Sequence, residues 1–205
     1  MEMPKPTDAH RRFENMAGNW RGAETLFPSP WDPNGGTATG QTKSRVALDG
    51  FTMIGDYQQE RNGVVTFRGH SVWTYDVKDQ NYVMYWWDNM GSAVNVFRGN
   101  FDGDKLTMNC TDYSGNWRLT YDYSNPDTLK SKMEMSQDGQ NWAPFFEGEY
   151  HRVAAEEPKP APAAAPAAAK AKKPIKKKPA IKKAAKVMKK KPAKPMKKKA
   201  KAKRR

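Results

Sequence analysis

The sequence is poor in cysteine and has no long apolar run. Cys110 is its only cysteine, which excludes an internal disulfide framework and fits a reducing compartment. No stretch approaches the roughly 18 consecutive apolar residues of a membrane-spanning helix, and no apolar run follows a basic N-terminal segment. We therefore expect a cytoplasmic protein without a membrane span.

Aromatic residues are missing from the last quarter of the chain. All seven Trp, eight Tyr and eight Phe precede Val153, whereas residues 154–205 hold 21 Lys or Arg against two acidic residues, a net charge of +19. Residues 1–153 hold 15 basic and 20 acidic residues, a net charge of −5. This composition predicts a globular domain at 1–153, an Ala/Pro-rich linker at 154–169 and a disordered lysine-rich tail at 170–205.

Helix signals are confined to residues 6–18, where Thr7 is a favourable N-cap and Gly18 a favourable stop. Beyond them, short runs of alternating apolar and polar residues are separated by Asp-Gly or Asn-Gly pairs, which favour tight hairpins. Strands of this kind, without crossover helices, can hide their apolar face by closing on themselves. We therefore predict an all-β fold, an antiparallel meander of ten strands closed into a barrel after a short N-terminal helix. The expected strands are residues 19–27, 37–48, 51–60, 64–75, 81–88, 93–101, 105–111, 116–123, 128–136 and 141–153.

The expected strand at 81–88 differs from the others, because Tyr82-Val-Met-Tyr-Trp-Trp87 carries large apolar groups on both faces. Its outward face needs a cover, since exposed apolar patches of this size are typical of association surfaces. Two explanations fit the sequence. The N-terminal helix packs there, or a second copy of the chain does so in a homodimer.

Gly18-Asn-Trp20, at the start of the first expected strand, resembles the Gly-x-Trp signature of lipocalins. In that superfamily the tryptophan closes one end of the barrel beneath an arginine from the last strand. The resemblance implies this pairing for Trp20 and Arg152, held by a cation–π contact.

Residues 5–153 as a whole resemble a bacterial family of uncharacterised proteins, domain of unknown function fifteen seventy-nine. The resemblance implies a single lipocalin-like, or calycin-like, barrel and supplies no activity, so function has to be argued from the residues. The matching segments are residues 16–22, 28–33, 35–40, 67–70, 87–91 and 133–139.

The common catalytic motifs are missing: a Gly-x-Ser-x-Gly elbow, a phosphate-binding Gly-Lys-Ser/Thr loop, a dinucleotide fingerprint and paired zinc cysteines. This favours a binding module over an enzyme. His70 and Asp88 lie on neighbouring expected strands, where they can pair for proton transfer or ligand hydrogen bonding, or only fix strand register. Tyrosines such as Tyr121 and Tyr150 line the lumen or fill it. The predicted binding residues for a small hydrophobic ligand are Trp20, His70, Asp88, Tyr121, Tyr150 and Arg152.

No cofactor or metal is expected, since three scattered histidines do not make a metal site. The alternative is haem, because the related haem-binding barrels called nitrobindins use a histidine near the C-terminal strand, which points to His151. If Arg152 faces inward toward Trp20, however, strand alternation turns His151 outward. The alternative function is thus a haem-binding or enzymatic barrel that uses His70 and Asp88 or His151.

The segment Pro28–Gly36 is longer than a hairpin requires, is stiffened by prolines and carries Trp31. Two roles fit it. The segment acts as a lid over the barrel mouth, or Trp31 tucks into the mouth as a plug.

The lysine-rich tail repeats Lys-Lys-Lys-Pro-Ala at residues 176–180 and 189–193. It has no aromatic residue for base stacking and few arginines for bidentate base contacts, which favours non-specific binding to DNA or RNA phosphates. In composition it resembles linker-histone tails. An anionic membrane surface, another acidic partner and a purely solubilising role are the alternatives. The predicted nucleic-acid contacts are Lys176, Lys177, Lys178, Lys182, Lys183, Lys189, Lys190, Lys191, Lys197, Lys198, Lys199, Arg204 and Arg205.

Taken together, the patterns predict a non-enzymatic, cytoplasmic bacterial protein. Its barrel holds a small hydrophobic ligand, while its tail anchors it to nucleic acid and so places it at the nucleoid.

Overall fold

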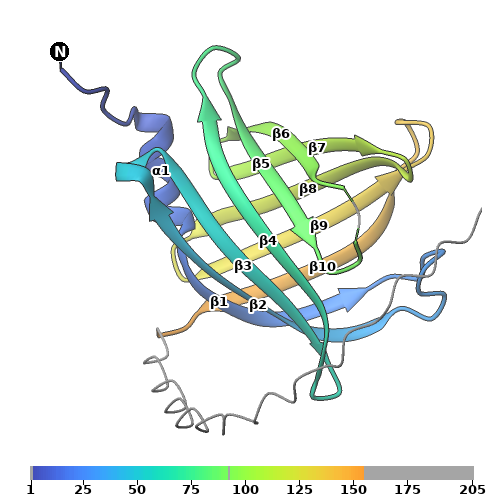
Figure 1. Ribbon diagram of the computed structural model, residues 1–205. Helices are drawn as coiled ribbons and strands as arrows, with labels where there is room; N and C mark the ends of the chain where they lie inside the picture. Colours follow the sequence, from blue (N-terminus) through green and yellow to red (C-terminus); the bar gives the residue numbers. More distant parts are fainter. Residues whose placement is uncertain (1, 92, 155–205) are drawn as a thin grey trace, which may run out of the picture. The chain divides into compact units, whose positions relative to one another are not determined.

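Ten antiparallel strands form a closed barrel that follows a single short helix (Figure 1). The computed structural model describes residues 2–91 and 93–154, so the predictions for the lysine-rich tail and for the linker beyond Ala154 lie outside the described residues. No helix in the described part of the chain has the length and apolar character to span a membrane. The elements are α1 (Asp8–Met16), β1 (Gly18–Leu26), β2 (Gly36–Ala47), the 3-10 turn η1 (Leu48–Gly50), β3 (Thr52–Arg61), β4 (Val64–Asp76), β5 (Asn81–Asp88), β6 (Asn95–Asp102), β7 (Lys105–Asp112), β8 (Gly115–Asn125), β9 (Thr128–Ser136) and β10 (Ala143–Arg152).

Each strand pairs with its neighbours in the sequence, and β10 closes the barrel against β1. The predicted all-β meander and its closure are confirmed, with strand boundaries that differ from the expected ones by no more than two residues. Between β3 and β4, Asn62 and Gly63 have φ angles of 52° and 79°. Positive φ at both central residues is what a two-residue hairpin turn requires, which explains this Asn-Gly pair.

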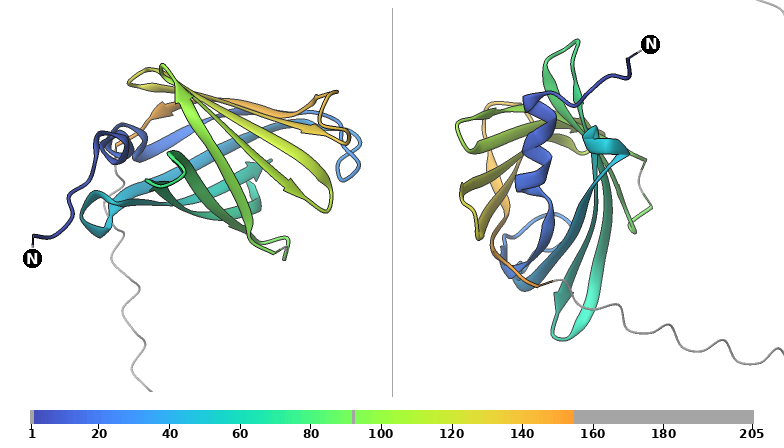
Figure 2. Two further views of the ribbon diagram at one scale, coloured as in Figure 1. Left: turned by 90° about the horizontal axis from the view of Figure 1, so that it is seen from above. Right: turned by 90° about the vertical axis from the view of Figure 1, so that its left-hand side faces the viewer.

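Helix α1 lies across one end of the barrel, and the loop between β1 and β2 lies at the opposite end (Figure 2). Phe13 of α1 is fully buried on the side of the helix that faces the barrel. The Tyr82 hydroxyl on β5 donates to the carbonyl oxygen of Ala9 in the helix at 2.8 Å. Thr7 is the N-cap, as predicted, and its backbone N–H donates to Nδ1 of His10 at 3.2 Å. Burial lowers the pKa of His10, which keeps Nδ1 free to accept this bond. The helix therefore closes one end of the lumen.

The guanidinium of Arg152 connects α1 to the first and last strands. It lies 4.1 Å from the ring centroid of Trp20, a buried side chain whose Nε1 donates to the carbonyl oxygen of Met16 at 3.1 Å. The contact between Trp20 and Arg152 that the lipocalin resemblance implied is thus present. Arg152 also donates to carbonyl oxygens at the end of α1 that would otherwise lack a donor. Arg152 donates to the backbone oxygens of Asn15 at 2.6 Å, Ala17 at 2.8 Å and Pro126 at 2.6 Å.

The structure explains why the first residue of the Gly-x-Trp motif, Gly18, is a glycine. Its φ angle is 135°, in the region that favours glycine, and a Cβ atom at this position would lie 2.5 Å from Nη1 of Arg152. Both the backbone conformation and the close approach of the guanidinium therefore require glycine.

The apolar groups on both faces of β5 have two different explanations. Tyr82 faces inward and meets α1, so the helix accounts for the inward side. Tyr85 and Trp87 face outward with their rings stacked 6.4 Å apart, and Trp87 is 42% exposed. Packing by the helix is therefore wrong as the explanation for Trp87, and the homodimer stays a prediction.

Candidate functional site

The inward side chains change character along the barrel axis. Near α1 they form a dense core that includes Trp73, Met84 and Leu106. Toward the opposite end, the inward aromatic side chains of Tyr57 and Trp86 are only partly buried. The end under α1 is therefore densely packed, whereas Tyr57 and Trp86 keep partial exposure; we name this second end the open end.

A buried carboxylate lies between the two ends. Glu24 is on β1, four residues beyond Trp20 and on the same inward face, and it is only 2% exposed. Its Oε1 accepts from the hydroxyls of Tyr57 at 2.7 Å and Tyr150 at 2.5 Å, and its Oε2 accepts from Nε2 of Gln59 at 2.7 Å. One carboxylate thus links β1, β3 and β10. We name Glu24, Tyr57, Gln59 and Tyr150 the glutamate cluster.

Two glycines make room for the glutamate cluster. A Cβ atom at Gly40 would lie 1.9 Å from Oε1 of Glu24, and one at Gly148 would lie 2.5 Å from the Tyr150 hydroxyl. Gly148 is the partner of Glu24 in the register of β1 and β10. The absence of side chains at these positions leaves the space that the carboxylate and the Tyr150 ring occupy.

The donors around Glu24 are neutral. Burial and, second, the negative charge of Glu24 raise the pKa values of Tyr57 and Tyr150, so both hydroxyls stay protonated and act as donors. In all three hydrogen bonds Glu24 is the acceptor, which is the pattern of an ionised carboxylate. In residues 2–91 and 93–154, Glu24 forms no ion pair with a Lys, Arg or His.

Tyr121 connects the closed end to the glutamate cluster. Its ring lies 5.9 Å from that of Trp73, and it packs against the buried group of Trp20, Leu129 and Tyr150. Burial raises the pKa of Tyr121, so its hydroxyl is protonated. The structure therefore brings four predicted binding residues, Trp20, Tyr121, Tyr150 and Arg152, to one part of the barrel.

The loop between β1 and β2 is attached beside the open mouth. Trp31 lies 6.2 Å from the rings of both Trp117 and Phe145, and it is 57% exposed. Asp32 pairs with Arg61 of β3 at 2.6 Å, which fixes the loop to the rim. Trp31 therefore packs against two side chains of the core cluster while more than half of it stays exposed, and both the lid and the plug stay predictions.

His70 contacts a carboxylate other than the one expected, and its pairing with Asp88 stays a prediction. His70 lies on the outward face of β4, and its Nδ1 is 2.8 Å from a carboxylate oxygen of Asp56 on β3. In the register of β4 and β5, Trp87 stands opposite His70 and Asp88 stands opposite Gly69, and His70 and Asp88 line the same groove. The histidine–carboxylate pair that the structure shows is His70–Asp56, on the outer wall. The open groove beside it has a volume of about 580 Å³ and is also lined by Trp87.

His151 faces outward, as the parity argument predicted. Its side chain is 64% exposed, and its Nε2 lies 3.9 Å from a carboxylate oxygen of Glu149. In the part of the chain that the structure describes, no group of three or more His, Cys, Asp or Glu side chains is arranged to hold a metal ion. A haem ligated by His151 would therefore have to sit on the outer wall of the barrel.

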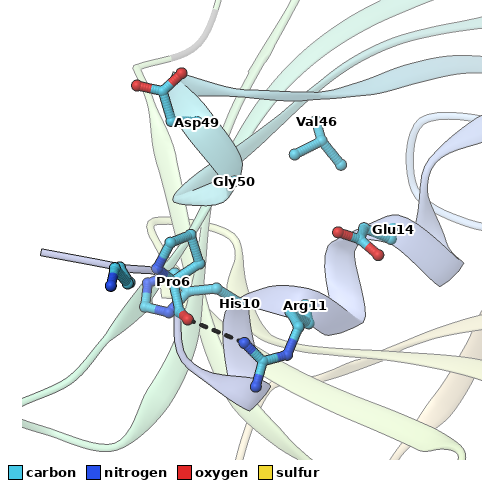
Figure 3. A pocket seen from close by; sticks show the side chains of 8 residues that line it. Pro6, His10, Arg11, Glu14, Val46, Asp49 and Gly50 are labelled. Atoms are coloured by element: carbon cyan, nitrogen blue, oxygen red, sulfur yellow. Dashed lines mark hydrogen bonds between the residues drawn. The ribbon is translucent and has the colours of Figure 1, made fainter.

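A smaller groove of about 310 Å³ lies at the closed end, between α1 and η1 (Figure 3). Arg11, at its edge, donates to the carbonyl oxygen of Pro6 at 3.2 Å and also pairs with Asp8. Its cation is thus already engaged within the helix turn. His10, Glu14 and Asp49 also line the groove.

Glu24 and Gln59 were not among the predicted binding residues. The available signal was parity: Trp20, Gly22 and Glu24 occupy alternate positions of one strand, and Trp20 was expected to face inward. A charged residue at an inward position is unusual enough to indicate a site. Gln59 gave no comparable signal, because it lies among polar residues near the end of β3.

Comparison with known proteins agrees with the barrel fold. The family model described as "Protein of unknown function (DUF1579)" matches residues 5–152, and no curated protein matches the chain at a significant level. Rv2717c from M. tuberculosis is 13% identical with a TM-score of 0.56, over 72% of this chain and 99% of that chain. The S-type phycobiliprotein lyase CPES from Guillardia theta is 9% identical with a TM-score of 0.52, over 73% and 95%. At these identities the likeness establishes the fold alone.

Substitution of Gly40 tests whether the missing side chain makes room for Glu24. We expect Gly40→Ala to lower the free energy of unfolding by about 1–3 kcal/mol, because the added methyl group overlaps the carboxylate. In a Glu24→Ala background the same substitution should cost about 1 kcal/mol less, since most of the overlap is gone. Urea denaturation followed by tryptophan fluorescence measures both values, and strictly additive effects would contradict this explanation.

Proposed function

The chain belongs to the family of proteins of unknown function DUF1579, and we propose that its domain is a non-enzymatic barrel that binds a small hydrophobic or aromatic molecule at the open end. One observation carries the proposal. Inward-facing aromatic side chains stay partly exposed around a buried polar cluster, in a barrel whose other end is filled. Small-molecule sites commonly combine an apolar lining with a few fixed polar groups.

The aromatic wall is built from three strands. Tyr57 lies 6.0 Å from the rings of both Phe67 and Trp86, and Phe67 and Trp86 are stacked 6.4 Å apart. A Cβ atom at Gly69 would lie 2.1 Å from Trp86, so this glycine lets the indole lie flat against β4. A flat apolar ligand is well suited to such a wall, because aromatic rings stack at these separations.

Adjacent tryptophans of β5 provide a matched test. Nile red, a neutral dye that brightens in apolar sites, should bind the full chain, and Trp86→Ala should weaken its binding about threefold to tenfold through loss of ring contacts. Trp87→Ala, which removes the outward-facing neighbour, should leave the affinity within about twofold. Fluorescence titration measures the three affinities.

Two results would refute the binding site at the open end. One is the absence of Nile red binding to the native chain. The other is an equal loss of affinity in the two variants, which would place the dye on the outer wall or at no defined site.

We further propose that the lysine-rich tail binds nucleic acid without sequence preference and places the barrel near DNA or RNA. The net charge of +19 on residues 154–205 supports this, together with the net charge of −5 on the remainder of the chain. Clustered lysines neutralise phosphates and release counterions, which supplies non-specific affinity. The acidic domain adds no attraction of its own, so the tail has to carry the binding.

Salt titration tests the role of the tail. If about 6–10 lysines contact phosphates, the affinity of the full chain for a DNA duplex should fall about 10³-fold to 10⁵-fold between roughly 50 and 200 mM salt. A full-length variant with glutamine at the thirteen predicted contact positions should lose the binding. Fluorescence anisotropy with labelled duplex measures both, and equal affinity of the two proteins would exclude the tail as the binding element.

A further inference from the structure

Glu24 is a buried carboxyl group that has no basic partner among the described residues. Its three hydrogen-bond donors, Tyr57, Gln59 and Tyr150, are all neutral. Removing a carboxylate from water is costly unless a countercharge or a full set of hydrogen bonds compensates for it. Because apolar side chains fill the closed end of this barrel, a carboxylate at this position points to a role in binding.

The two carboxylate oxygens are not equally satisfied. Oε1 accepts from two tyrosine hydroxyls, at 2.7 and 2.5 Å, whereas Oε2 accepts from the Gln59 amide at 2.7 Å. Each carboxylate oxygen has two lone-pair sites, so Oε2 retains acceptor capacity. The carboxylate oxygen with spare acceptor capacity is therefore Oε2, which accepts from the flexible side-chain amide of Gln59.

Gln59 lies on the side of the cluster that leads to the mouth. It is two residues beyond Tyr57 on β3, closer to the hairpin that joins β3 to β4. Its Nε2 lies 2.7 Å from Oε2 of Glu24 and 3.2 Å from the Tyr57 hydroxyl. The amide can therefore leave Oε2 and keep Tyr57 as a partner, which opens Oε2 to a group that enters from the mouth.

Tyr57, which donates to Glu24, lies 6.0 Å from the rings of both Phe67 and Trp86. Aromatic faces attract cations as well as apolar groups, and a charge-assisted hydrogen bond to a carboxylate is stronger than a neutral one. The site thus offers two features that favour a positive charge on an apolar or aromatic body.

We propose that the ligand of the barrel is an organic cation, a protonated amine on an aromatic or apolar frame, whose N–H group replaces the Gln59 amide at Oε2 of Glu24. This rests on the proposed binding of a small molecule at the open end. The aromatic wall holds the frame, and the ammonium group supplies the countercharge that the described part of the chain does not.

A pair of competitors of nearly equal shape tests the preference. Phenethylamine is a cation at neutral pH, and phenethyl alcohol is its neutral counterpart. With Nile red bound to the full chain, the amine should displace the dye at about tenfold lower concentration than the alcohol, because only the amine pairs with Glu24. In Glu24→Gln, measured against that variant's own Nile red affinity, the ratio should fall to within about twofold.

Two matched variants isolate the lumen charge. Glu147→Gln removes the same charge from the outward face of β10, where Glu147 pairs with Lys132 at 3.4 Å, and should keep the native preference for the amine. Gln59→Ala removes the competing amide and should keep the preference or raise it. Circular dichroism verifies that each variant is folded.

The outcomes separate this proposal from the proposed function. If Nile red does not bind the native chain, the binding site itself is refuted. If Nile red binds but the amine and the alcohol displace it equally, the binding site stands and the cation preference is wrong. This outcome is measured on the native chain alone. A preference that survives in Glu24→Gln would also overturn the assignment to Glu24.

Discussion

The hydrogen bonds to the Glu24 carboxylate are the interaction on which the functional interpretation depends. They join β1, β3 and β10 inside the barrel, and they hold a charge where the closed end of the lumen gives way to the open end. Gly40 and Gly148 have no side chain where one would collide with this cluster. A lumen that only had to be filled would need neither the carboxylate nor the space around it, since apolar packing stabilises a barrel interior without the cost of a buried charge.

The fold was predictable because its determinants are local. Period-two alternation marks the strands, Asx-Gly pairs such as Asn62-Gly63 and Asp102-Gly103 mark several of the hairpins, and antiparallel strands with one apolar face require closure. Trp20 and Arg152 were also predictable, through the resemblance of Gly18-Asn-Trp20 to a known signature, and the guanidinium does lie over the indole. The outward orientation of His151 then followed from parity alone.

The site was predictable only in part, because it depends on register between strands. Tyr121 and Tyr150 were expected in the lumen, but their relation to Glu24 depends on which residues of β1, β8 and β10 face one another. The same uncertainty explains the histidine pair. His70 and Asp88 were correctly expected on neighbouring strands, but the register between β3 and β4 sets Asp56 directly opposite His70, so Asp56 is the carboxylate at its Nδ1.

The central claim is that Glu24 is ionised inside the lumen, and infrared spectroscopy tests it most directly. A difference spectrum between the full chain with ¹³C-labelled glutamate and the same labelled chain carrying Glu24→Gln isolates the vibrations of this one side chain. The account predicts the stretching bands of a carboxylate at neutral pH, shifted by strong hydrogen bonds from Tyr57 and Tyr150. The carbonyl stretch of a protonated carboxylic acid in their place would contradict it, because a neutral Glu24 offers no charge for a cationic ligand to balance.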